Sequence, residues 1–146
     1  MSEPLTNVLL GKWTYRSFLS NPDPSVPFND LQFGVGTIRI DASPTNEFAG
    51  LIYGPGWELT LKGSTTWGNP FEVRFQGKGV VGGAEWIYDY IGYVVKPWPN
   101  GVNQRPAIVG SIVRTIPHPT GQDGNSTAPA GVVAQWIAVK RDDDAP

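Results

Sequence analysis

Residues 10–18 read Leu-Gly-Lys-Trp-Thr-Tyr-Arg-Ser-Phe, and polar side chains occupy every second position from residue 12 to residue 16. In an extended chain, Trp13, Tyr15 and Ser17 therefore share the other face. Alternation of this kind predicts a β-strand with one buried face. The same alternation recurs along most of the chain between clusters of Gly, Pro and Asn, and helical periodicity is almost entirely missing. The sequence therefore predicts an all-β protein.

The turn clusters divide the chain into eight predicted strands. Residues 21–27 contain three prolines, which lack backbone donors and exclude a regular element, so we expect a long loop there. Residues 42–46 are typical of a hairpin turn, and residues 117–129 form a predicted loop rich in Gly, Pro, Asn and Ser. Eight antiparallel strands in sequence order predict an up-and-down barrel, because closure leaves no open edge. The predicted strands cover residues 10–18, 33–41, 47–53, 57–65, 71–76, 80–95, 107–116 and 131–140.

Composition limits the class of protein. The 146 residues predict a single domain over 1–146, with a flexible tail at about 141–146. The chain has no Cys and one His, which excludes disulfides, thiolate metal sites and multi-His metal sites. A net charge of −2 argues against a nucleic-acid partner. We find neither a secretory signal nor an apolar run of about 18 residues, so we expect a cytoplasmic protein with no membrane partner.

A glycine motif at residues 77–82, Gly-Lys-Gly-Val-Val-Gly, matches the G-x-G-x-x-G pattern of dinucleotide-binding sites. In such a site a helix begins at the motif, so that its N-terminal amides bind the pyrophosphate. Here residues 84–90 are aromatic and typical of a strand, and residues 96–104 lack the acidic residue that these sites use. We interpret the glycines as a tight hairpin with positive φ angles and a bulge, and we expect no cofactor.

Three short motifs resemble the avidin and streptavidin family. They are Gly-Lys-Trp-Thr at 11–14, Glu-Phe-Ala-Gly at 47–50 and Val-Gly-Gly-Ala-Glu at 81–85. More broadly, a G-x-W motif in the first strand is similar to the calycin pattern of lipocalins and fatty-acid-binding proteins. The resemblance implies an eight-stranded barrel, often oligomeric, with a pocket open at one end and Trp13 filling the other. The biotin-binding positions do not carry over, because Tyr15 and Ile52 stand where the family has Asn and Tyr.

Aromatic residues share one face of the predicted strand at 80–95. If Trp86, Tyr88 and Tyr90 point inward, they form an aromatic wall for a flat or apolar ligand; the alternatives are core packing and a dimer face. Asp89 lies on the opposite face. If a bulge at the neighbouring glycines turned Asp89 inward, burial would raise its pKa and make it the best general acid or base. Facing outward, Asp89 is an exposed charge.

Residues from other strands are candidates for the same pocket. Tyr15 needs a hydrogen-bond partner for its hydroxyl if it is buried. Arg114 alternates with isoleucines on its strand. Three roles are open for it: it polarises a ligand carbonyl, it pairs with a buried carboxylate, or its side chain emerges at the barrel rim. His118, between two prolines, is an exposed loop residue or, as the alternative, a base on a pocket lid. Further candidate ligand contacts are Trp13, which also fits a core position, Ile52 and Trp136.

These residues support three hypotheses about function. The first is a cofactor-independent isomerase or cyclase for a hydrophobic metabolite, in which Asp89, Tyr15 or Tyr90 moves a proton. Arg114 would stabilise the charge that develops. The second is a binding or carrier protein for a hydrophobic ligand, without catalysis. The third is a protein-interaction module with a filled barrel and an exposed aromatic patch. Because six Trp, five Tyr and six Phe exceed what a barrel of this size can enclose, a homodimer is also predicted.

Overall fold

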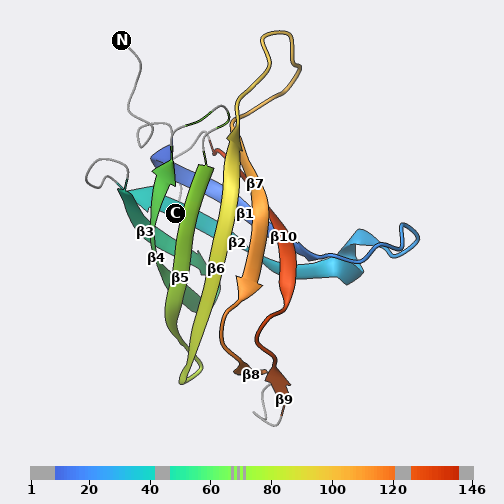
Figure 1. Cartoon of the computed structure of the whole chain (residues 1–146), viewed down its shortest axis with the longest axis vertical. Helices are drawn as coiled ribbons and strands as arrows, with labels where there is room; N and C mark the ends of the chain where they lie inside the picture. The colour runs from blue at the N-terminus through green and yellow to red at the C-terminus, as the bar shows by residue number, and fades with distance from the viewer. Residues whose placement is uncertain are drawn as a thin grey trace.

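The fold is a closed barrel of eight antiparallel strands, which confirms the predicted fold class (Figure 1). The computed structural model describes residues 9–41, 47–66, 68, 70, 72–120 and 126–141. Barrel strands that follow one another in the chain pair with each other, and the first and last close the barrel, with Arg16 opposite Ile137. The barrel strands are β1 (Gly11–Leu19), β2 (Gln32–Asp41), β3 (Glu47–Gly54), β4 (Trp57–Thr66), β5 (Glu72–Val81), β6 (Ala84–Val95), β7 (Ala107–Arg114) and β10 (Val133–Val139).

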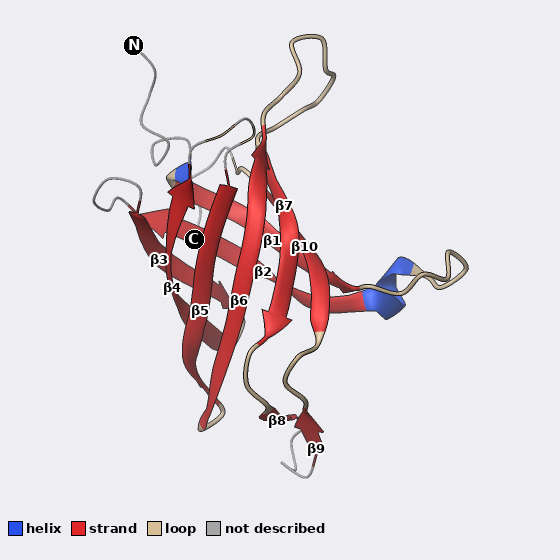
Figure 2. Ribbon diagram, in the orientation of Figure 1, coloured by secondary structure: helices blue, strands red, loops and turns tan. Residues whose placement is uncertain are grey.

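Short elements lie outside the barrel wall (Figure 2). A 3-10 helix, η1 (Phe28–Leu31), sits in the connection between β1 and β2. Two short strands, β8 (His118–Thr120) and β9 (Ser126–Ala128), pair with each other in the connection between β7 and β10, and we call them the mouth hairpin. The predicted loop over 117–129 therefore contains two short strands that the sequence did not indicate. Among the described residues, no helix is both long and apolar enough to span a membrane.

The observed strands lie close to the predicted ranges, and β5 differs most. The prediction ended this strand at residue 76, whereas β5 continues through two glycines to residue 81. Glycine suits these positions because there is little room for a side chain. A Cβ atom at Gly79 would lie 2.6 Å from the carbonyl oxygen of Glu58, and one at Gly77 would lie 3.2 Å from Cδ1 of Ile52. The predicted turn at 42–46 and most of the predicted tail, 142–146, lie outside the described residues.

A two-residue turn joins β5 to β6 and fixes which face of β6 points inward. Gly82 and Gly83 have φ angles of 60° and 84°, a left-handed pair that is typical of hairpin turns. The pairing then runs without a register shift along the two strands. The predicted hairpin is confirmed, but the predicted bulge is wrong for this strand pair. Simple alternation therefore decides the orientation of every side chain on β6.

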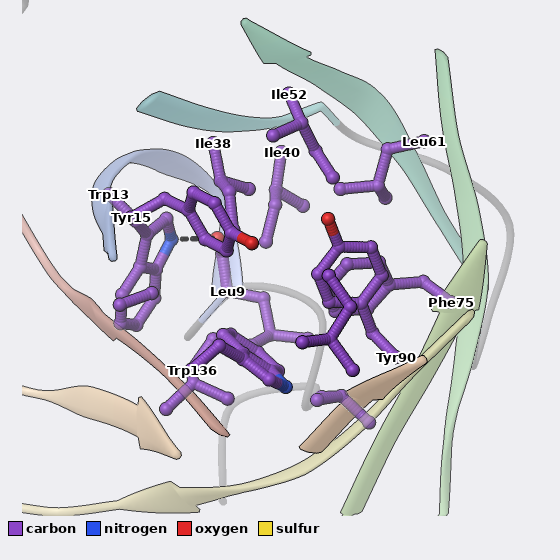
Figure 3. Close-up of a cluster of buried hydrophobic side chains, with 14 of the residues drawn as sticks. Leu9, Trp13, Tyr15, Ile38, Ile40, Ile52, Leu61, Phe75, Tyr90 and Trp136 are labelled. Atoms are coloured by element: carbon purple, nitrogen blue, oxygen red, sulfur yellow. Dashed lines mark hydrogen bonds between the residues drawn. The ribbon is translucent and has the colours of Figure 1, made fainter. Parts of the chain in front are cut away.

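One end of the barrel, where β1 begins and β10 ends, is filled by apolar side chains around Trp13 (Figure 3). The Trp13 side chain is fully buried, and its indole Nε1 donates a 2.8 Å hydrogen bond to the carbonyl oxygen of Leu9. The Nζ atom of Lys140 lies 5.0 Å from the centre of the Trp13 ring and donates to the carbonyl of Leu10. Trp13 is therefore a core residue that closes this end.

We expect Trp13→Ala to lower the free energy of unfolding by about 3–5 kcal/mol, because the change removes a fully buried indole and leaves a cavity. Urea titration followed by circular dichroism measures the effect. Trp98→Ala is the matched control, because Trp98 is 68% exposed and should contribute less than about 0.5 kcal/mol. Equal effects of the two substitutions would contradict the core role of Trp13.

Candidate functional site

A cavity of about 320 Å³ opens at the opposite end of the barrel, where β2, β4 and β6 begin and β7 ends. We call it the mouth cavity. The wall is formed largely by aromatic and aliphatic side chains, and no acidic or basic residue is among the described residues that line it. The lining includes Tyr15, Phe33, Trp57, Trp86, Tyr88 and Tyr90.

Two tyrosines form the floor of the mouth cavity, and Figure 3 shows their hydroxyls pointing toward one another. The rings of Tyr15 and Tyr90 meet edge to face with centroids 6.1 Å apart, although β1 and β6 lie three strands apart around the barrel. The Tyr15 hydroxyl donates to Oγ of Ser17 at 2.8 Å, and Ser17 donates to the Gly34 carbonyl at 3.5 Å. This ordered chain gives the buried hydroxyls of Tyr15 and Ser17 a partner.

Burial raises the pKa of both floor tyrosines. Removal from water is the largest cause for each, and for Tyr90 the neighbouring Tyr15 raises the pKa further. Ser17 and Tyr90 partly offset this for Tyr15 by hydrogen bonding. Both phenols are therefore neutral near pH 7. They are suited to orienting a polar atom of a ligand and poorly suited to removing a proton from it.

The mouth hairpin places the chain's one histidine against the cavity wall. His118 is 4% exposed, and its ring stacks on the indole of Trp86 with centroids 3.9 Å apart and an interplanar angle of 13°. Its Nε2 atom lies 2.8 Å from the hydroxyl oxygen of Tyr88. Trp86 and Tyr88 both line the mouth cavity, so His118 supports the wall from behind. The prediction of an exposed loop histidine is wrong, and the alternative position beside a pocket agrees with the structure.

Hydrogen bonds decide which nitrogen of His118 carries the proton. Its Nδ1 atom lies 3.1 Å from the carbonyl oxygen of Pro119, which can only accept, so Nδ1 is the donor. In the neutral ring, Nε2 then accepts from the Tyr88 hydroxyl. Burial lowers the pKa of His118; the Pro119 carbonyl partly offsets this effect, and the charge of Arg114 adds to it. The Tyr88–His118 pair is therefore a phenol hydrogen-bonded to a neutral imidazole.

Arg114 brings a positive charge to the back of the same wall. It is the cross-strand partner of Tyr88 and lies on the inward face of β7 with Ile112. Its guanidinium carbon lies 4.9 Å from the centre of the Phe33 ring and 5.9 Å from the centre of the Tyr88 ring. Its Nη1 atom donates to the carbonyl oxygen of Pro129 at 3.2 Å, which ties β7 to the end of the mouth hairpin. Arg114 therefore contacts residues of the cavity wall without lining the cavity itself.

Three predicted ligand contacts lie in the core. Trp13 closes the far end, and Ile52 is fully buried. Trp136 packs against Gly92, and its Nε1 atom donates to two strand carbonyls at 3.0 and 3.2 Å. None of these side chains lines the mouth cavity, because each is packed against other core residues. Tyr15, Trp86, Tyr88 and Tyr90, by contrast, are brought together at the cavity.

Asp89 lies on the outer surface of the barrel. Its carboxylate accepts hydrogen bonds from Gln76 at 3.0 Å and Thr115 at 2.7 Å. It borders a separate outer hollow of about 460 Å³, along with Ile91. The alternation that turns its neighbours on β6 inward turns Asp89 outward. The hypothesis of Asp89 as a general acid or base inside the barrel is therefore wrong in its geometry.

Sequence reasoning missed Phe33 and Trp57, which line the mouth cavity. A usable signal was present. In an up-and-down barrel, alternate strands begin at the same end, so the predicted strands at 33–41 and 57–65 start at one rim. Phe33 and Trp57 are the first residues of these two strands, and Trp86 stands near the start of the next strand in the same direction. Aromatic residues at alternate strand starts therefore predict an aromatic rim.

Within the described residues, no group of three or more His, Cys, Asp or Glu side chains is placed to hold a metal ion.

No protein-family model, curated protein or solved structure matches this chain. The resemblance of residues 11–14 to the avidin family stays a prediction. The homodimer and the cytoplasmic location likewise stay predictions.

We expect the pKa of His118 to lie below its ordinary value of 6.5, because burial disfavours the charged ring. NMR of untagged protein can follow the ring protons without assignment, since the chain has one His. As the pH falls below 6.5, the unfolded chain takes up this proton before the folded protein does, so the free energy of unfolding should decrease. His118→Gln should remove that decrease. A titration midpoint at or above 6.5 would overturn the assignment of a buried neutral ring.

Proposed function

We propose that this protein binds a small apolar molecule in the mouth cavity. The proposal is supported by a cavity of about 320 Å³ whose wall is largely aromatic and aliphatic. Small-molecule sites typically occupy about 300–1,000 Å³, are mostly apolar, and carry a few well-placed polar groups. The cavity is at the small end of that range. An interaction module with a filled barrel is less compatible with such a space.

Polar groups lie at both ends of the mouth cavity and suit an oriented ligand. The neutral hydroxyls of Tyr15 and Tyr90 are at the floor, and the hydroxyl of Tyr88 is on the wall, held by His118. Apolar surface between them favours binding by about 25 cal/mol for each Å² removed from water. The apolar wall would therefore supply most of the affinity, and the hydroxyls would choose among orientations.

A second candidate function is proton transfer on the bound molecule, and the Tyr88–His118 pair is the observation that favours it. The imidazole accepts the hydrogen bond of a phenol that lines the cavity. Tyr88 would then exchange a proton with the bound molecule, while His118 orients its hydroxyl. The protein would then be a cofactor-independent isomerase or cyclase. In this form of the hypothesis Tyr88 replaces Asp89 as the group that moves a proton.

We expect the neutral fluorescent probe N-phenyl-1-naphthylamine to bind with an increase in emission. Ile112→Phe fills part of the cavity and should weaken binding by about tenfold or more, which corresponds to about 1.4 kcal/mol. The matched control is Ile91→Phe, the same change on the outer face, where the side chain is 39% exposed. Equal affinity of the two variants, or no binding to the native protein, would contradict the proposal.

Catalysis is tested on compounds that copurify with the protein from its source, identified by native mass spectrometry and extraction. If the protein is an enzyme, incubation converts the compound, and Tyr88→Phe slows conversion by about 100-fold or more. Tyr93→Phe is the control, because Tyr93 lies on the same strand but is 46% exposed. Recovery of the compound unchanged after incubation favours a binding protein.

A further inference from the structure

Two buried hydrogen-bond donors beside the wall of the mouth cavity have no acceptor among the residues that the structure describes. They are Nε of Arg114 and the indole Nε1 of Trp86. Both side chains pack beside Tyr88: the Trp86 and Tyr88 ring centroids are 6.3 Å apart, and the guanidinium carbon is 5.9 Å from the Tyr88 ring centre. A buried donor without an acceptor is unfavourable, and native proteins rarely leave one. Two such donors around one cavity-lining ring indicate an acceptor supplied from outside the chain.

Arg114 also lacks a counter-ion among the residues that the structure describes. The ion pairs there are made by other residues on exposed surfaces: Arg39–Asp41, Arg74–Glu72 and Lys78–Glu85. Among the described residues, the guanidinium contacts two aromatic rings and the carbonyl oxygen of Pro129, and its charge acts on the His118 ring. A half-buried guanidinium in such surroundings retains an unneutralised positive charge. An anionic ligand would both accept the hydrogen bond and neutralise this charge.

We propose that the ligand of the mouth cavity is an apolar monocarboxylic acid whose carboxylate lies at the rim, bound by Trp86 of the cavity lining and by Arg114, which lies beyond the lining against Phe33 and Tyr88. This inference rests on the proposed function and names the ligand class. A carboxylate matches the guanidinium in charge and accepts two parallel hydrogen bonds from it. A neutral carbonyl would accept a hydrogen bond but leave the charge of Arg114 in place. A phosphate dianion would need more positive charge than Arg114 alone supplies, and no basic side chain among the described lining residues adds to it.

The rest of the mouth cavity agrees with an acid that has an apolar body. With the carboxylate beside Arg114 and Trp86 at the rim, the body extends toward the neutral phenols of Tyr15 and Tyr90 at the floor. His118, the titratable group behind the wall, is neutral in the folded protein, so it brings no competing cation. One end of the site is therefore specific for charge and the other for shape.

The test compares 2-naphthoate with 2-naphthamide, which has nearly the same shape and no charge. Isothermal titration calorimetry at pH 7.5 measures both affinities. We expect 2-naphthoate to bind about tenfold tighter or more, because a hydrogen bond to a charged partner is stronger than one between neutral groups. Equal affinities, or tighter binding of the amide, would overturn the inference while leaving the proposed function intact. Failure of both compounds and of the neutral fluorescent probe would overturn the proposed function and this inference together.

Variants show whether Arg114 is the source of the preference. Arg114→Gln should reduce the ratio of the two affinities to about one, because the charge that distinguishes the acid from the amide is removed. Arg74→Gln is the matched control, because the Arg74 side chain is 66% exposed on the outer face, and it should keep the full ratio. Trp86→Phe keeps an aromatic ring but removes the donor, and it should weaken 2-naphthoate binding by about three- to tenfold. A full ratio in Arg114→Gln would overturn the assignment.

If Arg114→Gln does not fold, Arg114→Lys provides the same test with the charge retained. Lysine lacks the planar fork, so 2-naphthoate should bind about tenfold more weakly than to the native protein. The ring NMR signals of His118, whose site adjoins Arg114, report whether each variant keeps the native mouth. Native affinity for 2-naphthoate in a folded Arg114→Lys variant would overturn bidentate binding by the guanidinium.

Discussion

An eight-stranded barrel has an interior just wide enough for side chains from different walls to touch, and here aromatic rings make that contact. Phe75 stacks on Tyr90 with centroids 4.5 Å apart, and Trp136 meets both rings edge to face. Tyr15 reaches the same cluster from β1. These rings fill the cross-section between the end closed by Trp13 and the mouth cavity. The depth of the cavity therefore follows from how far the aromatic cluster extends along the barrel.

Polar groups are treated differently at the floor and at the rim of the mouth cavity. At the floor, the Tyr15 hydroxyl has a partner within the protein, in a chain of hydrogen bonds that runs through Ser17 to the Gly34 carbonyl. At the rim, Nε of Arg114 and Nε1 of Trp86 are buried and have no acceptor in the part of the chain that the structure describes. Hydroxyls that are hydrogen-bonded within the protein make the floor rigid. Buried donors without an acceptor favour binding of a ligand that supplies one. The contrast separates the part of the cavity that belongs to the fold from the part that recognises a ligand.

The sequence predicted the barrel well because alternation and turn residues are local signals. Trp13, Tyr15 and Ser17 face inward as residues 10–18 indicated. Asp89 could be placed only once the register beside the glycine turn was known, because a one-residue shift reverses a strand's faces. The position of His118 depends on Trp86 and Tyr88, about 30 residues earlier in the chain. Local pattern carries no information about such a long-range contact, so the pair at the centre of the site could not be found from sequence.

The closing pair of strands has a consequence for how this chain folds. Most barrel strands pair with their neighbours in sequence, so their hairpins close short loops. The pairing of β1 with β10 instead joins Arg16 to Ile137, across nearly the whole chain. Contacts of such long separation have a high entropic cost and slow folding. We therefore expect an open, curved sheet to form first and the seam between β1 and β10 to close late. Until then, two unpaired edges would be available to other molecules of the same chain, which makes the seam the step most exposed to aggregation.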